Sequence, residues 1–223
     1  MLEFFEKFGN LLWKCTADTL FMTFLSTALA YVLGLPLGVL LKITNKNGIA
    51  QSKVFNNVGG AVINIFRSLP FMILMIFVIP LTRAIVGTSI GPLAAVVPLV
   101  IGASPFIARL VESSLEEVDP GVIEAARCMG ATNFQIITRV LLVESVPSLL
   151  RGASIATITI MGYTAITGAI GAGGLGDLAY RYGYQRYQPS VMYATVIILI
   201  LLVGIVQTVF NSIGKKLDKR ISG

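Results

Sequence analysis

The sequence predicts an all-α integral membrane protein with five transmembrane helices and a polar two-helix segment between the third and the fourth. The 223 residues are 55% hydrophobic and only 13% charged, with a mean hydropathy of +0.83. A soluble domain is about 45–50% apolar and about 25% charged. Long uncharged runs recur along the chain, and about 20 helical residues cross a bilayer. Helices satisfy their own backbone groups in lipid, and these runs exceed the length of a barrel strand.

One integral domain, residues 19–214, contains all the predicted spans, which are residues 19–41, 58–82, 88–110, 150–172 and 190–213. Residues 1–18 form a predicted external segment. Its charges, and the lack of a small-residue cleavage site, argue against a cleavable signal. Gly34, Pro36 and Gly38 predict a kink or tight packing at the inner end of the first span. Residues 215–223 form a basic cytoplasmic tail.

Basic residues orient the predicted spans. If the C-terminus is cytoplasmic, five spans place the N-terminus outside. Eleven of the 17 lysines and arginines then lie inside, five lie outside, and Arg67 lies within the second span. Because cytoplasmic loops carry the excess of Lys and Arg, the sequence favours this orientation, which puts the polar segment in the cytoplasm.

The polar segment, residues 119–143, has the signals of two short helices joined at a glycine. Asp119 before Pro120 predicts a helix start, because the carboxylate accepts from free amides and proline is tolerated in the first turn. Gly130 ends that helix by adopting a positive φ. Thr132 and Gln135 have capping-box spacing for a second helix. A folded, charged segment of this length is more than a turn requires, so we expect another protein to bind it.

Composition also bounds the chemistry. The net charge of +6 indicates membrane orientation rather than nucleic-acid binding. With no histidine, and with Cys15 and Cys128 on opposite sides of the predicted membrane, we expect no zinc site, disulfide or histidine base. Gly171-x-Gly173-x-x-Gly176 matches a dinucleotide fingerprint by letters only, and we expect a flexible turn or gate at the external face. No GxxxxGK[ST] motif occurs, so another subunit must supply any nucleotide hydrolysis.

The polar segment resembles the cytoplasmic motif of type-I ABC importer permeases. That motif is Glu-Ala-Ala, three residues, glycine, nine residues and an aliphatic-x-Leu-Pro ending. Here Glu124-Ala125-Ala126 is followed by three residues and Gly130, and nine residues later by Val140-Leu141-Leu142. Val143 stands where the motif has proline, which predicts a straighter second helix with its bend deferred to Pro147.

The resemblance covers nearly the whole chain and is strongest to the methionine importer permeases. It implies a homodimer in the bacterial inner membrane, two cytoplasmic ATPase subunits that hold ATP and magnesium, and an external substrate-binding lipoprotein. This chain would itself bind no cofactor and catalyse no reaction, and its cargo would be D- or L-methionine. The supporting stretches are Asn64–Phe71, Ile79–Arg83, Val86–Gly91, Pro105–Arg109 and Gly171–Gly176.

The resemblance also gives the polar segment a role, as a coupling segment seated in a groove of the ATPase. The residues that would carry this coupling are Asp119, Glu124, Ala125, Ala126 and Gly130. Two small alanines would allow close approach of the ATPase, and the glycine would form the elbow. An ordinary loop helix is the alternative interpretation.

Four residues are candidates for the substrate pathway or its gate. Arg67 is a charge within a span, which is costly and usually faces protein or water, and Glu112 is a candidate partner. Met161, Tyr163 and Thr164 lie in the fourth span, which is rich in small and hydroxylated residues. A polarizable lining would suit a thioether substrate. For all four residues, packing within the bundle is the alternative interpretation.

The sequence leaves other functions open beside ATP-driven methionine import. An importer of a different small amino acid or of a peptide would use the same scaffold. An ATP-independent carrier or channel would need paired intramembrane acids or histidines for proton coupling, and these are missing. A membrane enzyme would need a nucleophile–base pair or a metal cluster, and the sequence has no recognisable one.

Overall fold

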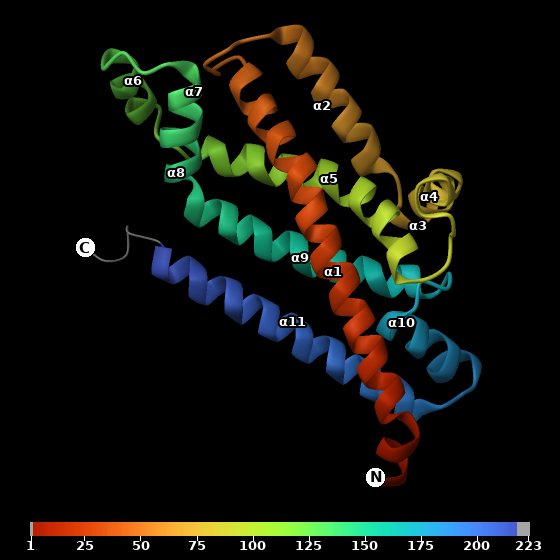
Figure 1. The fold of residues 1–223 in the computed structure, drawn as a ribbon. Coiled ribbons are helices and arrows are strands. Elements are labelled where there is room, and N and C mark those ends of the chain that lie inside the picture. The colour runs from red at the N-terminus through yellow and green to blue at the C-terminus, as the bar shows by residue number, and fades with distance from the viewer. Residues whose placement is uncertain (1, 218–223) are drawn as a thin grey trace. The chain divides into compact units, whose positions relative to one another are not determined.

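The computed structural model describes residues 2–217, which are helical apart from their turns and loops (Figure 1). Within these residues, four helices are long and apolar enough to cross a membrane: α1 (Leu2–Thr44), α5 (Pro92–Glu116), α9 (Val146–Gly168) and α11 (Pro189–Leu217). The bent pair α2 (Lys53–Ser68) and α3 (Phe71–Phe77) gives a fifth if it is one span. This all-helical architecture confirms the predicted fold class.

The second predicted span, residues 58–82, is broken rather than continuous. It is divided among α2, α3 and α4 (Ile79–Val86). Pro70 is the N-cap of α3, with φ −56° and ψ 130°, and Pro80 lies in the first turn of α4. Proline lacks the amide hydrogen that a continuing helix needs, so each proline begins a new helix.

The remaining elements are short and connect the long helices. They are α6 (Pro120–Cys128), α7 (Asn133–Gln135), η1 (Ile136–Leu141), α8 (Leu142–Glu144), α10 (Gly174–Leu178) and η2 (Ala179–Gln185). Both η elements are π-helical. The predicted external segment 1–18 is continuous with α1 from Leu2 onward. Within the predicted basic tail, residues 218–223 lie outside the described residues.

The chain forms two compact units, and α1, α5, α9 and α11 each contribute to both. The first unit comprises Met1–Ala30, Leu69–Ala103 and Thr157–Gln207. The second comprises Tyr31–Ser68, Ser104–Ala156 and Thr208–Gly223. The polar segment therefore belongs to the second unit, and the glycine-rich loop at 171–176 belongs to the first.

In the second unit, α1 and α5 pack in direct backbone contact. A Cβ atom at Gly34 would lie 2.7 Å from Ile107 Cγ2, and one at Gly38 would lie 2.5 Å from the Ala108 carbonyl oxygen. Neither distance is possible for a real side chain, so only glycine fits at these positions. The tight packing predicted at the inner end of the first span is confirmed, and α1 continues through Pro36.

In the first unit, the loop at 171–176 is held from two sides. The Gly91 amide donates to the Gly171 carbonyl at 3.1 Å, and the Leu175 amide donates to Thr19 Oγ1 at 2.9 Å. No strand precedes the loop in the described chain, so it lacks the context of a dinucleotide fingerprint. It is a turn packed against its neighbours, and the flexible turn or gate at the external face stays a prediction.

Candidate functional site

The polar segment begins with the predicted cap. Asp119 is the N-cap of α6, and its Oδ1 accepts a hydrogen bond from the Gly121 amide at 2.7 Å. Pro120 occupies the first helical position, where no amide donor is needed. Val118, just before the cap, is buried. A capped start beside a buried anchor fixes where α6 leaves the end of α5.

Gly130 forms the elbow between the two short helices. Its φ is +81°, a left-handed conformation that favours glycine. Its amide donates to the Arg127 carbonyl at 2.9 Å, and the Ala131 amide donates to the Ala126 carbonyl at 3.1 Å. These two bonds make a Schellman motif, which satisfies the last carbonyls of α6. The predicted helix end is confirmed.

The second helix begins with the predicted capping box and then widens. Thr132 Oγ1 accepts from the Gln135 amide at 3.3 Å, and Gln135 Oε1 accepts from the Thr132 amide at 2.8 Å. After this cap the chain enters the π-helix η1 and then α8, which carries Val143. The helical path continues through Val143, and the interruption comes at Ser145, two residues before Pro147. The predicted continuation of the helix past the Val143 position is confirmed, and the bend at Pro147 stays a prediction.

The Glu-Ala-Ala motif is partly exposed and partly buried. Glu124 and Ala125 are exposed, whereas Ala126 is only 4% exposed. Ala126 therefore packs within its own chain, in the part of the second unit where α6 contacts η1. Of the two alanines, Ala125 is the exposed one, and a role for either in close approach of a partner stays a prediction.

Two large apolar residues flank the elbow, and sequence reasoning missed both. Met129 is 81% exposed and Phe134 is 73% exposed. Val122 on α6 is 41% exposed. Exposed apolar groups gathered on a surface commonly mark a protein interface. The available signal was the pair of large apolar residues within four positions of Gly130.

A polar cluster at the base of the segment joins the end of α5 to the start of α9. Glu117 accepts from Ser148 Oγ at 2.7 Å and pairs with Arg151 at 3.2 Å. Ser145 Oγ donates to the Leu141 carbonyl at 2.7 Å. Glu117 thus holds together the two chain segments that enter and leave the polar segment.

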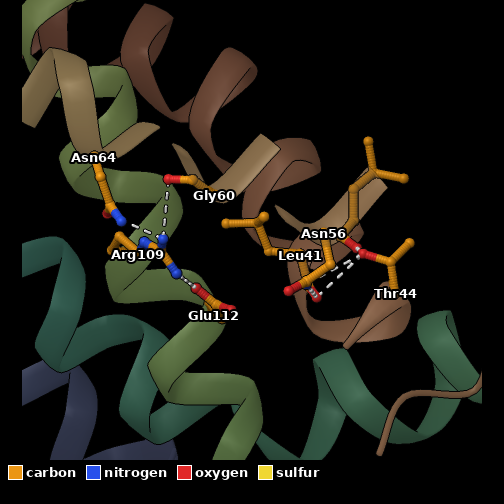
Figure 2. Close-up of polar contacts among 8 residues, drawn as sticks. Leu41, Thr44, Asn56, Gly60, Asn64, Arg109 and Glu112 are labelled. Atoms are coloured by element: carbon orange, nitrogen blue, oxygen red, sulfur yellow. Dashed lines mark hydrogen bonds and ion pairs between the residues drawn. The ribbon is translucent and has the colours of Figure 1, made fainter. Parts of the chain in front are cut away.

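Arg109 links α5 to α2 in the same unit (Figure 2). It pairs with Glu112 at 2.6 Å, and its Nη2 donates to the Gly60 carbonyl at 3.3 Å and to Asn64 Oδ1 at 3.0 Å. Glu112 is 8% exposed, so its charge is matched by a neighbour one turn away on α5. Figure 2 also shows Asn56, whose Nδ2 donates to the Leu41 carbonyl at 2.9 Å and so ties α2 to α1.

Arg67 does not pair with Glu112, which corrects the predicted partnership. It lies in the last turn of α2 and is exposed. Within the described chain its side chain makes no hydrogen bond or ion pair. Arg109 takes the carboxylate instead because it stands three residues from Glu112 on the same helix, a spacing that brings side chains together.

Comparison with known proteins identifies the family of this chain. The family model for the binding-protein-dependent transport system inner membrane component matches residues 34–223. The chain belongs to this family. The probable D-methionine transport system permease protein MetI of Vibrio cholerae is 47% identical over 98% of this chain and 97% of its own length. The methionine import system permease protein MetP of Bacillus subtilis is 48% identical, covering 97% and 100% respectively.

A solved structure of an inward-facing MetNI methionine ABC transporter contains a chain of the same fold. The TM-score is 0.95 at 47% identity, over 96% of this permease and 99% of that chain. The resemblance drawn from residues 119–143 and the supporting stretches is thereby confirmed. This protein is a multi-pass inner-membrane permease component of an ABC transporter and is not itself an enzyme.

Three of the four pathway candidates, those on α9, belong to the first unit. The fourth, Arg67, belongs to the second unit. Met161 is 1% exposed and Thr164 is 2% exposed, and Thr164 Oγ1 donates to the Met161 carbonyl at 2.7 Å. Tyr163 is half-buried and stacks on Phe71 of α3, with ring centroids 4.3 Å apart. Met161 and Thr164 are therefore packed inside this chain, while Tyr163 touches the helix that follows the Pro70 break.

A cavity of about 540 Å³ lies in the first unit. Charged groups of both signs line it, namely Lys14, Asp18, Asp177 and Arg181. Arg181 forms an ion pair with Asp177 and donates a hydrogen bond to its carboxylate. That hydrogen bond raises the pKa of Arg181 above its usual value. Sequence reasoning missed this cavity because its lining comes from three distant segments.

Proposed function

We propose that this chain is the membrane subunit of an ATP-driven methionine importer. It would act as a homodimer, with two cytoplasmic ATPase subunits and an external substrate-binding lipoprotein. The observation that carries the proposal is the capped, glycine-hinged segment 119–143, which exposes Glu124, Ala125, Met129 and Phe134 for a partner. The names of the MetI and MetP relatives supply the cargo.

The polar segment would transmit movement of the ATPase to the spans. An ATPase that grips Met129 and Phe134 pulls on α6, whose start is fixed by Asp119. Glu117 then passes the displacement to the end of α5 and, through Ser148 and Arg151, to the start of α9. Because Arg109 connects α5 to α2, the movement also reaches the helix that ends at the Pro70 break.

Reconstitution tests the proposal directly. The permease is placed in proteoliposomes with its ATPase and its binding protein, and uptake of radiolabelled methionine is followed with and without ATP. We expect uptake only when ATP and the ATPase are both present. Equal uptake by the permease alone would contradict coupling, and would favour a carrier or channel. ATP-dependent uptake of another amino acid or of a peptide, but not of methionine, would contradict the cargo.

Native cysteines test the proposed orientation, with the N-terminus outside and the C-terminus cytoplasmic. Cys128, at the end of α6, is exposed, whereas Cys15 is buried. A membrane-impermeant maleimide should therefore label Cys128 in inside-out vesicles and leave intact spheroplasts unlabelled. The matched control is Cys128→Ser, which should abolish labelling. Labelling of Cys128 from the outside would overturn the orientation.

A further inference from the structure

A small cavity lies where α9 begins and α11 ends, within the second unit. Its volume is about 160 Å³, and Pro147, Leu150, Phe210 and Gly214 line it together with Asn211, Arg151 and Lys215. The apolar members and Gly214 are half-buried, while the amide and the two cations are exposed. The cavity thus has an apolar floor and a polar, positively charged rim.

The cavity stands at the end of two membrane spans. The apolar span of α11 runs to Lys216, with Lys215 in its last turn. Arg151 lies in the second turn of α9, five residues after that helix begins. Long basic side chains at span ends reach the lipid head groups, so we expect both cations to lie at the depth of the lipid phosphates. This is the membrane face from which the segment 119–143 projects.

We propose that this cavity binds the head group of an anionic phospholipid. The lining carries two positive charges and no acidic residue, and basic pockets between spans on the cytoplasmic side bind anionic head groups. Asn211 supplies an amide for phosphate or glycerol oxygens. Leu150 and Phe210 give the first acyl carbons an apolar surface. The site is independent of the cargo and of the pathway residues.

The size of the cavity argues for a lipid head group rather than a soluble metabolite. Pockets for small molecules are usually about 300–1,000 Å³, and this one is smaller. It holds a phosphate with a short alcohol, while the remainder of the ligand lies outside it. A phospholipid fits this description, because its acyl chains remain in the bilayer.

Arg151 connects the proposed site to the coupling segment. Its Nη2 donates to Glu117 at 3.2 Å, and a guanidinium has five N–H donors, so other donors of Arg151 are available to a phosphate. Glu117 does not line the cavity. A lipid in the cavity would therefore hold Arg151 in place beside Glu117, rather than displace it.

The test uses the complex of permease and ATPase, purified in mild detergent. It is incubated with equal amounts of phosphatidylglycerol and phosphatidylcholine, and native mass spectrometry counts the lipids that are retained. We expect selective retention of phosphatidylglycerol. Lys215→Gln should reduce that retention about fivefold, the effect of one basic residue at an anionic surface. The matched control, Lys216→Gln, removes the same charge from the adjacent position outside the cavity and should leave retention unchanged.

A second variant tests the space in the cavity independently of its positive charges. Gly214→Leu keeps both cations, and a Cβ atom there would meet no atom within 4 Å. The added side chain should fill part of the cavity and reduce retention without loss of the ATPase from the complex. Melting temperatures of all variants check folding.

Three results would overturn the proposal. Equal losses in Lys215→Gln and Lys216→Gln would indicate general surface charge. Equal retention of the two lipids would remove the preference for an anionic head group. Full displacement of phosphatidylglycerol by excess inorganic phosphate would assign the site to the free anion.

Discussion

The coupling segment and the middle of α9 differ in how their structure is stabilised and in which side chains they expose. In the segment 119–143, backbone geometry is specified by polar side chains and a glycine, and large apolar groups such as Phe134 remain exposed. In α9, the backbone is a plain helix, and Met161 and Thr164 are buried. The first region is ordered by its own caps and offers an exposed surface. The second obtains its order from packing and offers no free surface at these two positions.

This difference separates two kinds of mutational outcome. A change at the elbow should leave the bundle folded and stop transport, because the elbow acts on another subunit. A change at a buried α9 position should first reduce stability. The predictions below test that separation, in order of decreasing expected effect.

Gly130→Pro should abolish transport, with a loss of at least tenfold, while the permease still inserts in the membrane. Proline fixes φ near −65°, whereas Gly130 has φ +81° and donates to Arg127. ATP-dependent methionine uptake and membrane abundance are the two measurements. Gly162→Ala is the matched control, because a Cβ atom there meets no atom within 4 Å. Normal uptake by Gly130→Pro would contradict the role of the elbow.

Met161→Ala should lower the free energy of unfolding by about 2–5 kcal/mol, the cost of deleting a buried side chain. Ile166, 37% exposed on the same helix, is the matched position, and Ile166→Ala should cost less. Thermal denaturation in detergent measures both. An unchanged melting temperature for Met161→Ala, with altered methionine affinity, would instead assign Met161 to the pathway.

The two adjacent alanines of the motif should respond differently to leucine. Ala126→Leu overfills a buried site and should cost about 1–3 kcal/mol of stability. Ala125→Leu should leave stability unchanged and weaken retention of the ATPase, because Ala125 is exposed. Melting temperature and co-purification of the ATPase distinguish the two. Loss of the ATPase in neither variant would contradict a coupling role for the motif.

Asp119→Ala should cost about 1 kcal/mol by removing the N-cap of α6. The expected result is a lower melting temperature and a modest loss of transport. Asp119→Asn is the control, since an asparagine side chain still accepts from the Gly121 amide. If Asn behaved like Ala, the negative charge rather than the cap would be the important property.

Arg67→Ala should change the free energy of unfolding by no more than about 0.5 kcal/mol, because the side chain is exposed. Transport then decides its role. A rate reduced severalfold with normal folding would support a place on the pathway. A normal rate would exclude Arg67 from that role.

Local signals made most of the coupling segment predictable. Asp119, Gly130 and the Thr132–Gln135 box act on neighbouring backbone groups, so their effect is readable from short stretches of sequence. The four long apolar helices were readable because hydrophobic length is a property of each run. The type and general position of these elements needed no knowledge of tertiary contacts.

Features set by contacts at long range were not predictable. Arg109 donates to Gly60 and Asn64, which are 49 and 45 residues away in the chain, and no short stretch of sequence indicates these partners. Its pair with Glu112 is local, and the prediction gave that carboxylate to Arg67 instead. The π-helices η1 and η2 have no sequence signal of comparable strength to a cap. Ala126 is buried whereas its neighbour Ala125 is exposed. This difference depends on how α6 packs, which the motif does not encode.

The direct contact of α1 with α5 at Gly34 and Gly38 has a mechanical consequence. Helices separated by a layer of side chains slide by small adjustments of that layer, which is the basis of shear motion. Here Ile107 Cγ2 and the Ala108 carbonyl occupy the space that such a layer would need. We therefore expect these two stretches of α1 and α5 to move together as one rigid unit during transport.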